Sequence, residues 1–295
     1  MCAMLLPVGY HTAVDGKRRA FMWSGEEKTS GAQCLVAWDK VTTLREHGGL
    51  GIRDLALQNN CLLLKLIHRL HRPGESSWAQ WVHENADVSS LTGDLDGSHW
   101  SMLRQLLPVY QAITTVKLGN GRSTSFWNDW WLPAGRLAEL FPALASHATN
   151  PAASVHRVIL DGLRAHMVPR LSRVAEAEFA EVSDLIADTV LRDELDERCS
   201  ELLDRNGQLK ASRVYKLVKS ANAVECNFAK FVWKNRAPPK VQFFAWLVVQ
   251  ERVQCKVNLH AKTIVDDDKC ETETTFVFRT ASYMYLTPLR LHELP

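Results

Sequence analysis

Residues 231–247 have the sequence Phe-Val-Trp-Lys-Asn-Arg-Ala-Pro-Pro-Lys-Val-Gln-Phe-Phe-Ala-Trp-Leu. Apolar side chains recur at helical spacing on both sides of the two prolines, a pattern typical of amphipathic helices. Because proline interrupts a helix from within, one helix should end before Pro238-Pro239 and another should follow them. The stretch therefore predicts two short helices joined at the prolines.

The same stretch combines positive charge with aromatic rings. Cations beside aromatic side chains suit contact with phosphates and stacking against bases. The candidate nucleic-acid-binding residues are Lys230, Trp233, Lys234, Arg236, Lys240 and Trp246. In the alternative interpretation the aromatics form a core that Lys and Arg merely flank. The pattern leaves both open.

Charge is unevenly distributed along the chain, although its net value is only +2. From Glu176 to Asp204 there are eleven acidic and two basic residues, a net charge of −9. From Arg205 to Lys262 there are twelve basic and two acidic residues, a net charge of +10. Either the two blocks face each other and neutralise, or the basic block contacts phosphate while the acidic block faces solvent.

Upstream of the basic block, residues 173–204 form a predicted acidic helical segment. Phe179, Val182, Ile186 and Val190 recur at helical spacing, and the carboxylates occupy the remaining surface. Such a distribution is typical of a solvated helix face and not of a metal site.

The middle of the chain, residues 75–150, is a tryptophan-rich connector. It contains Gly119-Asn120-Gly121 between short apolar runs. Asn-Gly in that position predicts a β-hairpin near residues 115–127. The Gly-x-Gly pattern alone does not indicate a phosphate loop, because no G-K-[ST] or further glycine follows at the required spacing.

The first 72 residues contain a strongly periodic segment. Leucines recur at helical spacing after Asp54, and Pro73-Gly74 should stop the helix. Gly48-Gly49 suggests a tight backbone passage before it. His68 and His71 lie on this helix among basic residues, and we interpret them as part of a partly exposed basic face.

The fold class expected is mainly α, with the small hairpin near 115–127 and two or three loosely joined helical units. The predicted segments are 1–72, 75–150, 173–204, 206–282 and a tail at 283–295.

The sequence also predicts the cellular compartment of the protein. No run of about 18 or more apolar residues occurs, so no transmembrane helix is expected. The apolar N-terminal stretch is too short for a signal peptide. The seven cysteines of the chain are dispersed and include no C-x-x-C pair. We expect an intracellular protein, in the nucleus or cytoplasm, that is not secreted and has no membrane partner and no small-molecule substrate.

Motifs for catalysis are absent from the sequence. There is no G-x-S-x-G and no H-E-x-x-H. Asp266-Asp267 is similar to the paired aspartates of polymerase palms, but Asp268 and Lys269 follow directly and no alternating strand does. An acidic surface turn is the favoured interpretation.

Several long motifs resemble, in order, the C-terminal region of plant LINE-type, non-LTR retrotransposon reverse transcriptases, over about residues 15–282. Residues 231–247, followed by Asn258-Leu259 and Lys262, resemble its zinc-binding domain. The segments resembling its thumb and connector are Arg19-Ala-Phe-Met-Trp-Ser-Gly25, Val36-Ala-Trp-Asp-Lys-Val41, Gly48-Gly-Leu-Gly-Ile-Arg-Asp-Leu55 and Leu118-Gly-Asn-Gly-Arg-Ser-Thr-Ser-Phe-Trp-Asn-Asp-Trp130.

The resemblance has two chemical implications. The family's palm and its catalytic aspartates have no counterpart here, so no polymerase activity is expected. At the family's zinc-ligand positions, Cys270 is retained, whereas Phe276 and Thr280 stand at the His and last Cys positions. One ligand of four cannot close a tetrahedral site, so we expect no cofactor and no bound zinc.

The function expected is therefore that of a non-catalytic reverse transcriptase remnant with weak, non-specific RNA or DNA binding. The sequence leaves two alternatives open: a decayed open reading frame with no selected function, and a helical protein-interaction module. It does not indicate an oligomeric state.

Overall fold

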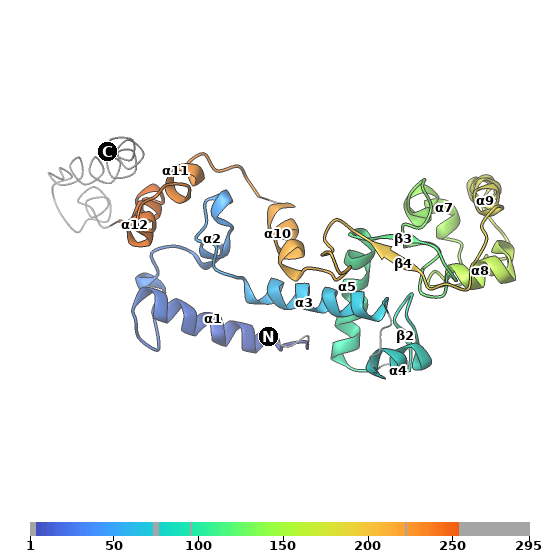
Figure 1. Ribbon diagram of the computed structural model, residues 1–295, viewed down its shortest axis with the longest axis horizontal. Coiled ribbons are helices and arrows are strands. Elements are labelled where there is room, and N and C mark those ends of the chain that lie inside the picture. The colour runs from blue at the N-terminus through green and yellow to red at the C-terminus, as the bar shows by residue number, and fades with distance from the viewer. Residues whose placement is uncertain (1–3, 73–76, 95, 222, 254–295) are drawn as a thin grey trace, which may run out of the picture. The chain divides into compact units, whose positions relative to one another are not determined.

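The computed structural model describes residues 4–72, 77–94, 96–221 and 223–253 (Figure 1). Within these ranges helices predominate, accompanied by two small antiparallel two-stranded sheets. The expectation of a mainly α fold is confirmed. None of the described helices is long and apolar enough to cross a membrane.

Contacts divide the chain into two compact units, each of which combines two separate stretches of the sequence. Unit 1 comprises the residues up to Leu6 together with Leu57–Val214. Unit 2 comprises Pro7–Ala56 together with the residues from Tyr215 onward. Residues 7–56 and the described residues after Val214 therefore share one unit.

Unit 2 is built from helices, most of which are short. These are α1 (Val8–Trp23), η1 (Gly31–Gln33), α2 (Trp38–Thr42), η2 (Arg45–His47), α11 (Ala229–Trp233) and α12 (Pro239–Val249). The two helices predicted around the prolines are confirmed as α11 and α12. Pro239 is the first residue of α12, where its fixed φ suits the helix and its missing N–H costs nothing.

The core of unit 2 joins residues that are distant in sequence. Its buried members are Val36, Val41, Val232, Trp246 and Leu247. The predicted tight passage at Gly48-Gly49 lies beside it. A Cβ on Gly49 would lie 2.1 Å from the Thr43 carbonyl oxygen, so only glycine fits there.

Unit 1 holds both sheets and the remaining helices; α3 and α10 each continue into unit 2. The helices are α3 (Leu55–Leu70), α4 (Ser77–Asn85), α5 (Ser98–Ala112), α6 (Leu137–Leu140), α7 (Pro142–Ala145), α8 (Val155–Asp161), η3 (Leu163–His166), α9 (Arg173–Ile186) and α10 (Ala211–Ala221). The strands are β1 (Ala86–Asp87), β2 (Thr92–Gly93), β3 (Thr115–Lys117) and β4 (Glu197–Cys199).

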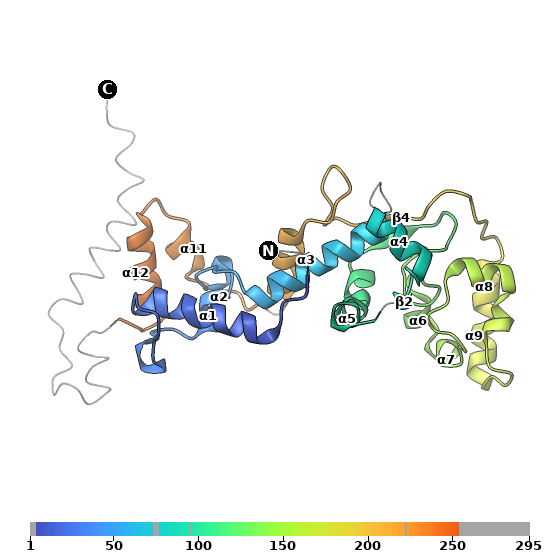
Figure 2. The ribbon, with the colours of Figure 1, turned by 90° about the horizontal axis from the view of Figure 1, so that it is seen from below.

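One core of unit 1 surrounds the aromatic residues of the connector. Phe126 and Trp127 are buried together with apolar residues of α6 to α9. In Figure 2, α7, α8 and α9 gather at one end of this unit, and α7 contacts α9.

The hairpin near residues 115–127 needs a correction. Strand β3 forms where it was expected, but it pairs with β4, with Val116 opposite Arg198. Phe126 and Trp127, the expected second arm, instead lie in the core. The true partner lies about 80 residues further along the chain, beyond the reach of a local turn pattern.

The acidic helix also ends earlier than predicted. Helix α9 stops at Ile186, and Val190 is 76% exposed. Val182 is fully buried, and Phe179 and Ile186 pack against the core, so the first part of the predicted stripe is confirmed. Beyond α9 the chain instead forms β4, which buries Arg198.

Candidate nucleic-acid interface

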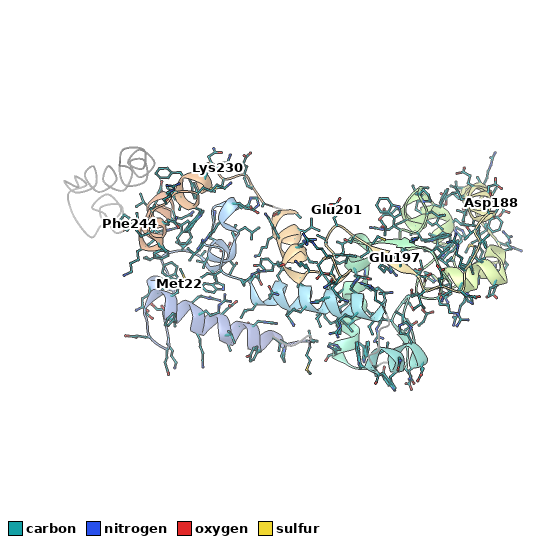
Figure 3. All side chains as sticks on the ribbon, in the orientation of Figure 1. Met22, Asp188, Glu197, Glu201, Lys230 and Phe244 are labelled. Atoms are coloured by element: carbon teal, nitrogen blue, oxygen red, sulfur yellow. The ribbon has the colours of Figure 1, made fainter. Side chains whose placement is uncertain are left out.

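Four cations of unit 2 project from α11, α12 and the loop between them. Lys230, Lys234, Arg236 and Lys240 are all exposed, and Lys230 extends outward from α11 (Figure 3). In the described part of the chain, none of their side chains has a hydrogen bond or ion pair. We call these four residues the basic surface.

In contrast to the basic surface, two lysines of α10 that belong to unit 2 are paired with carboxylates. Lys216 Nζ lies 3.2 Å from Glu46 Oε1, and Lys219 Nζ lies 3.1 Å from Asp54 Oδ2. These lysines are already neutralised by carboxylates. The four cations of the basic surface have no such carboxylate partner among the described residues.

Trp233 lies at the C-terminal end of α11 and is half-buried. The guanidinium carbon of Arg45 lies 4.7 Å from its ring centroid, within the range of a cation–π contact. The ring therefore has one side occupied by Arg45 and still retains some exposed surface beside the basic surface.

The prediction that Trp246 stacks on a base is wrong. Its side chain is fully buried, and its indole N–H donates to the Gly48 carbonyl oxygen at 2.9 Å. A base needs an exposed ring face, and Trp246 offers none. Of the six candidates, five are at least partly exposed and Trp246 belongs to the core.

A buried polar cluster in unit 1 was missed at the sequence level. The side chains of Arg198 and Asp129 form an ion pair with no exposed surface. Arg198 Nη2 lies 2.9 Å from Asp129 Oδ2 and also donates to the Ser123 carbonyl oxygen at 2.9 Å. These residues come from β4 and the connector, so no sequence spacing signals the pair.

His68 and His71 belong to this cluster and not to an exposed basic face, which corrects that interpretation. His68 contacts the Tyr110 hydroxyl at 3.0 Å and the Gly207 carbonyl oxygen at 2.8 Å. His71 stacks on the Tyr110 ring with centroids 5.1 Å apart. Burial lowers the pKa of both histidines, and for His71 it does so strongly.

The Gly119-Asn120-Gly121 turn is held by a carboxylate of the protein itself. Asp196 Oδ1 accepts hydrogen bonds from the backbone N–H of Gly119 at 2.9 Å and of Gly121 at 2.8 Å. Its Oδ2 accepts from the backbone and hydroxyl of Ser123 and from the Thr124 hydroxyl. The turn is thus an internal anion cradle that is already filled.

The C-terminal part of the chain matches a known family. Residues 210–274 match the model described as zinc-binding in reverse transcriptase. Over 92% of its length the chain is 26% identical to an Arabidopsis thaliana protein provisionally named a ribonuclease H protein. The resemblance to the C-terminal region of a plant retrotransposon reverse transcriptase is thereby confirmed.

The chain spans 45% of the length of that relative. No solved structure matches this chain. The basic surface lies inside the region that matches the reverse transcriptase zinc-binding family, and the buried Asp129–Arg198 pair lies outside it.

The zinc-ligand positions of this reverse transcriptase family fall at the end of the matched region and just beyond it. Cys270, Phe276 and Thr280 lie outside the described residues, as do Asp266-Asp267 and the tail at 283–295. Among the residues that are described, no group of three or more His, Cys, Asp or Glu could hold a metal ion. The donor set in the sequence does not fit a tetrahedral zinc site, because phenylalanine cannot ligate a metal.

Proposed function

We propose that this retroelement-derived chain binds RNA or DNA without sequence preference and without catalysis, through the basic surface and Trp233. The observation that carries the proposal is four exposed cations that have no acidic partner in the described residues, beside a partly exposed tryptophan. Lysine and arginine bind phosphates in a sequence-independent way, and an aromatic ring can stack on any base.

Salt dependence follows from this proposal. If about four phosphates are contacted, affinity should fall about 50- to 150-fold between about 50 and about 200 mM salt, because each contact releases a counterion. The lower figure applies to single strands and the higher to duplexes.

The first prediction removes most of the basic surface. In a variant with Lys234→Gln, Arg236→Gln and Lys240→Gln, affinity for a single-stranded oligonucleotide should fall on the order of 10-fold or more at low salt. The slope of log affinity against log salt should become shallower by the contribution of about three phosphate contacts. Fluorescence anisotropy at several salt concentrations measures both quantities.

A matched control removes the same charge from unit 1. Arg170, Arg173 and Arg205 are exposed, and their replacement by glutamine should leave the affinity nearly unchanged. An equal loss in both triple variants would mean that net charge alone governs binding. An unchanged affinity in the first variant would contradict the assignment of the basic surface.

The second prediction concerns zinc. We propose that the chain holds no structural zinc, because Cys270 is the one family ligand position that its sequence retains. Metal analysis of the purified chain should give well under one zinc per molecule, and a chelator should leave the thermal midpoint unchanged. A tightly held stoichiometric zinc ion would refute the proposal.

A further inference from the structure

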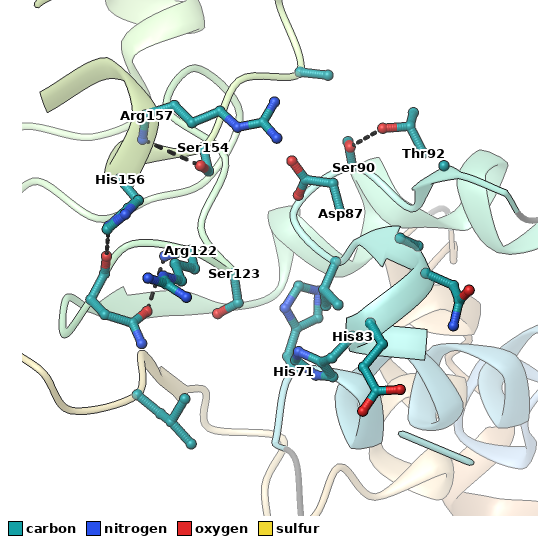
Figure 4. Close-up of a pocket in the computed structure, with 18 of the residues that line it drawn as sticks. His71, His83, Asp87, Ser90, Thr92, Arg122, Ser123, Ser154, His156 and Arg157 are labelled. Atoms are coloured by element: carbon teal, nitrogen blue, oxygen red, sulfur yellow. Dashed lines mark hydrogen bonds between the residues drawn. The ribbon is translucent and has the colours of Figure 1, made fainter. Parts of the chain in front are cut away.

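Unit 1 contains a cavity of about 800 Å³, within the size range of small-molecule sites. It lies among α4, the β1–β2 turn, the loop at 120–123 and the start of α8 (Figure 4). The residues that line it include three histidines, two arginines and two carboxylates.

His71 contributes a buried ring nitrogen without a hydrogen-bond partner. Its side chain lines the cavity and is 1% exposed. Its Nδ1 lies 3.3 Å from Arg198 Nη2, which already donates to Asp129 and to the Ser123 carbonyl oxygen. Its Nε2 has no hydrogen-bond partner among the described residues. An unsatisfied buried polar atom is costly, and a polar ligand atom would satisfy it.

Two further histidines are fixed by backbone carbonyls. His83 Nε2 lies 2.8 Å from the Leu70 oxygen, and His156 Nδ1 lies 2.9 Å from the Asn120 oxygen. Since a carbonyl only accepts, each of these nitrogens carries the ring hydrogen. In the neutral rings, His83 Nδ1 and His156 Nε2 are left as acceptors.

Charges of both signs line the cavity. Arg122 and Arg157 are exposed and have no side-chain partner in the described part of the chain, whereas Asp87 accepts from both the backbone and the hydroxyl of Ser89. Figure 4 shows Arg157 and His156 across the cavity from His71 and His83. Guanidinium groups suit phosphate, and the histidines and Asp87 suit a ligand that donates as well as accepts.

We propose that this cavity binds a nucleotide, with its phosphate at Arg122 and Arg157 and its base facing His71 and His83. A phosphate alone would leave the acceptors on His83 and His156, and the second carboxylate oxygen of Asp87, without a donor. A nucleoside alone would leave the arginines without an anion. A nucleotide with an amino-bearing base supplies both. The source is either a free nucleotide or the phosphorylated end of a nucleic-acid strand.

The test uses the full chain and adenosine 5′-monophosphate as the probe, with binding measured by calorimetry. Binding should be weaker by about tenfold or more for adenosine and for inorganic phosphate, because each lacks one set of contacts. Competition by an oligonucleotide carrying a 5′-phosphate, but not by the same strand without it, would assign the site to strand ends. Absence of such competition would assign it to free nucleotides.

Variants decide whether the cavity is responsible. Arg122→Gln with Arg157→Gln should raise the Kd for adenosine 5′-monophosphate about tenfold or more, whereas Arg170→Gln with Arg173→Gln should not. No binding by the unmodified chain, equal binding of inorganic phosphate, or equal affinity in the two double variants would overturn the proposal. The Lys234, Arg236 and Lys240 variant lies in unit 2 and should keep its nucleotide affinity, so the two proposals fail separately.

Discussion

Replacing Asp129 by leucine is expected to lower the free energy of unfolding of unit 1 by about 3–5 kcal/mol. Asp129 and Arg198 have fully buried side chains, so the substitution leaves an uncompensated guanidinium inside the protein. It also removes the carboxylate that accepts from the Ser125 backbone N–H at 2.7 Å. Loss of the partner costs far more than the intact pair contributes, because the desolvated charge cannot return to water.

Two controls separate the buried charge from general disturbance of the fold. Replacing both members, Asp129→Leu with Arg198→Met, removes the buried charges together and should recover much of the lost stability. Glu197→Gln breaks an exposed pair with Lys117 at 3.4 Å, between β4 and β3, and it should have little effect. A Glu197 variant as unstable as the Asp129 variant would contradict this account.

Urea unfolding followed by tryptophan fluorescence gives the overall change. Hydrogen exchange of the β3 and β4 amides gives a readout confined to unit 1, because Arg198 lies on β4 and β4 pairs with β3. A loss below about 1 kcal/mol in the Asp129 variant would show that water reaches the arginine, since only a solvated charge is that inexpensive to leave unpaired.

Replacing Trp246 by alanine is expected to destabilise unit 2 by about 3–5 kcal/mol. The ring is fully buried among residues from both ends of the chain, and its removal leaves a large cavity. The Gly48 carbonyl oxygen would also lose its indole donor. Trp246→Phe retains most of the packing and should cost less than the alanine variant. Urea unfolding compares the two.

The phenylalanine variant also tests whether Trp246 contacts nucleic acid. While it is folded, its affinity for a single-stranded oligonucleotide should equal that of the unmodified chain, because the ring is not exposed. Trp233→Leu, which alters the half-buried ring, should instead weaken binding, since stacking contributes about 1–3 kcal/mol per base. Weaker binding by folded Trp246→Phe would place Trp246 in the interface.

Local sequence patterns predicted the helices whose boundaries are set by neighbouring residues. Helix α3 begins at Leu55, directly after Asp54, and α11 and α12 lie on either side of Pro238, because helical periodicity and proline act within a few residues. The exposure of Lys230 also follows, since cations on short amphipathic helices face water. The same patterns misplaced Trp246, because an apolar stripe does not say which aromatic is covered.

The sequence by itself determined the helical class, the glycine passage at Gly49 and the resemblance to the reverse transcriptase zinc-binding region. Tertiary structure alone decided that β3 pairs with β4, that α9 ends at Ile186, and that Arg198 meets Asp129. The physical reason is range. Backbone propensity and periodicity act over a turn or two, whereas the Asp129–Arg198 pair joins residues 69 positions apart that meet only when the core excludes water.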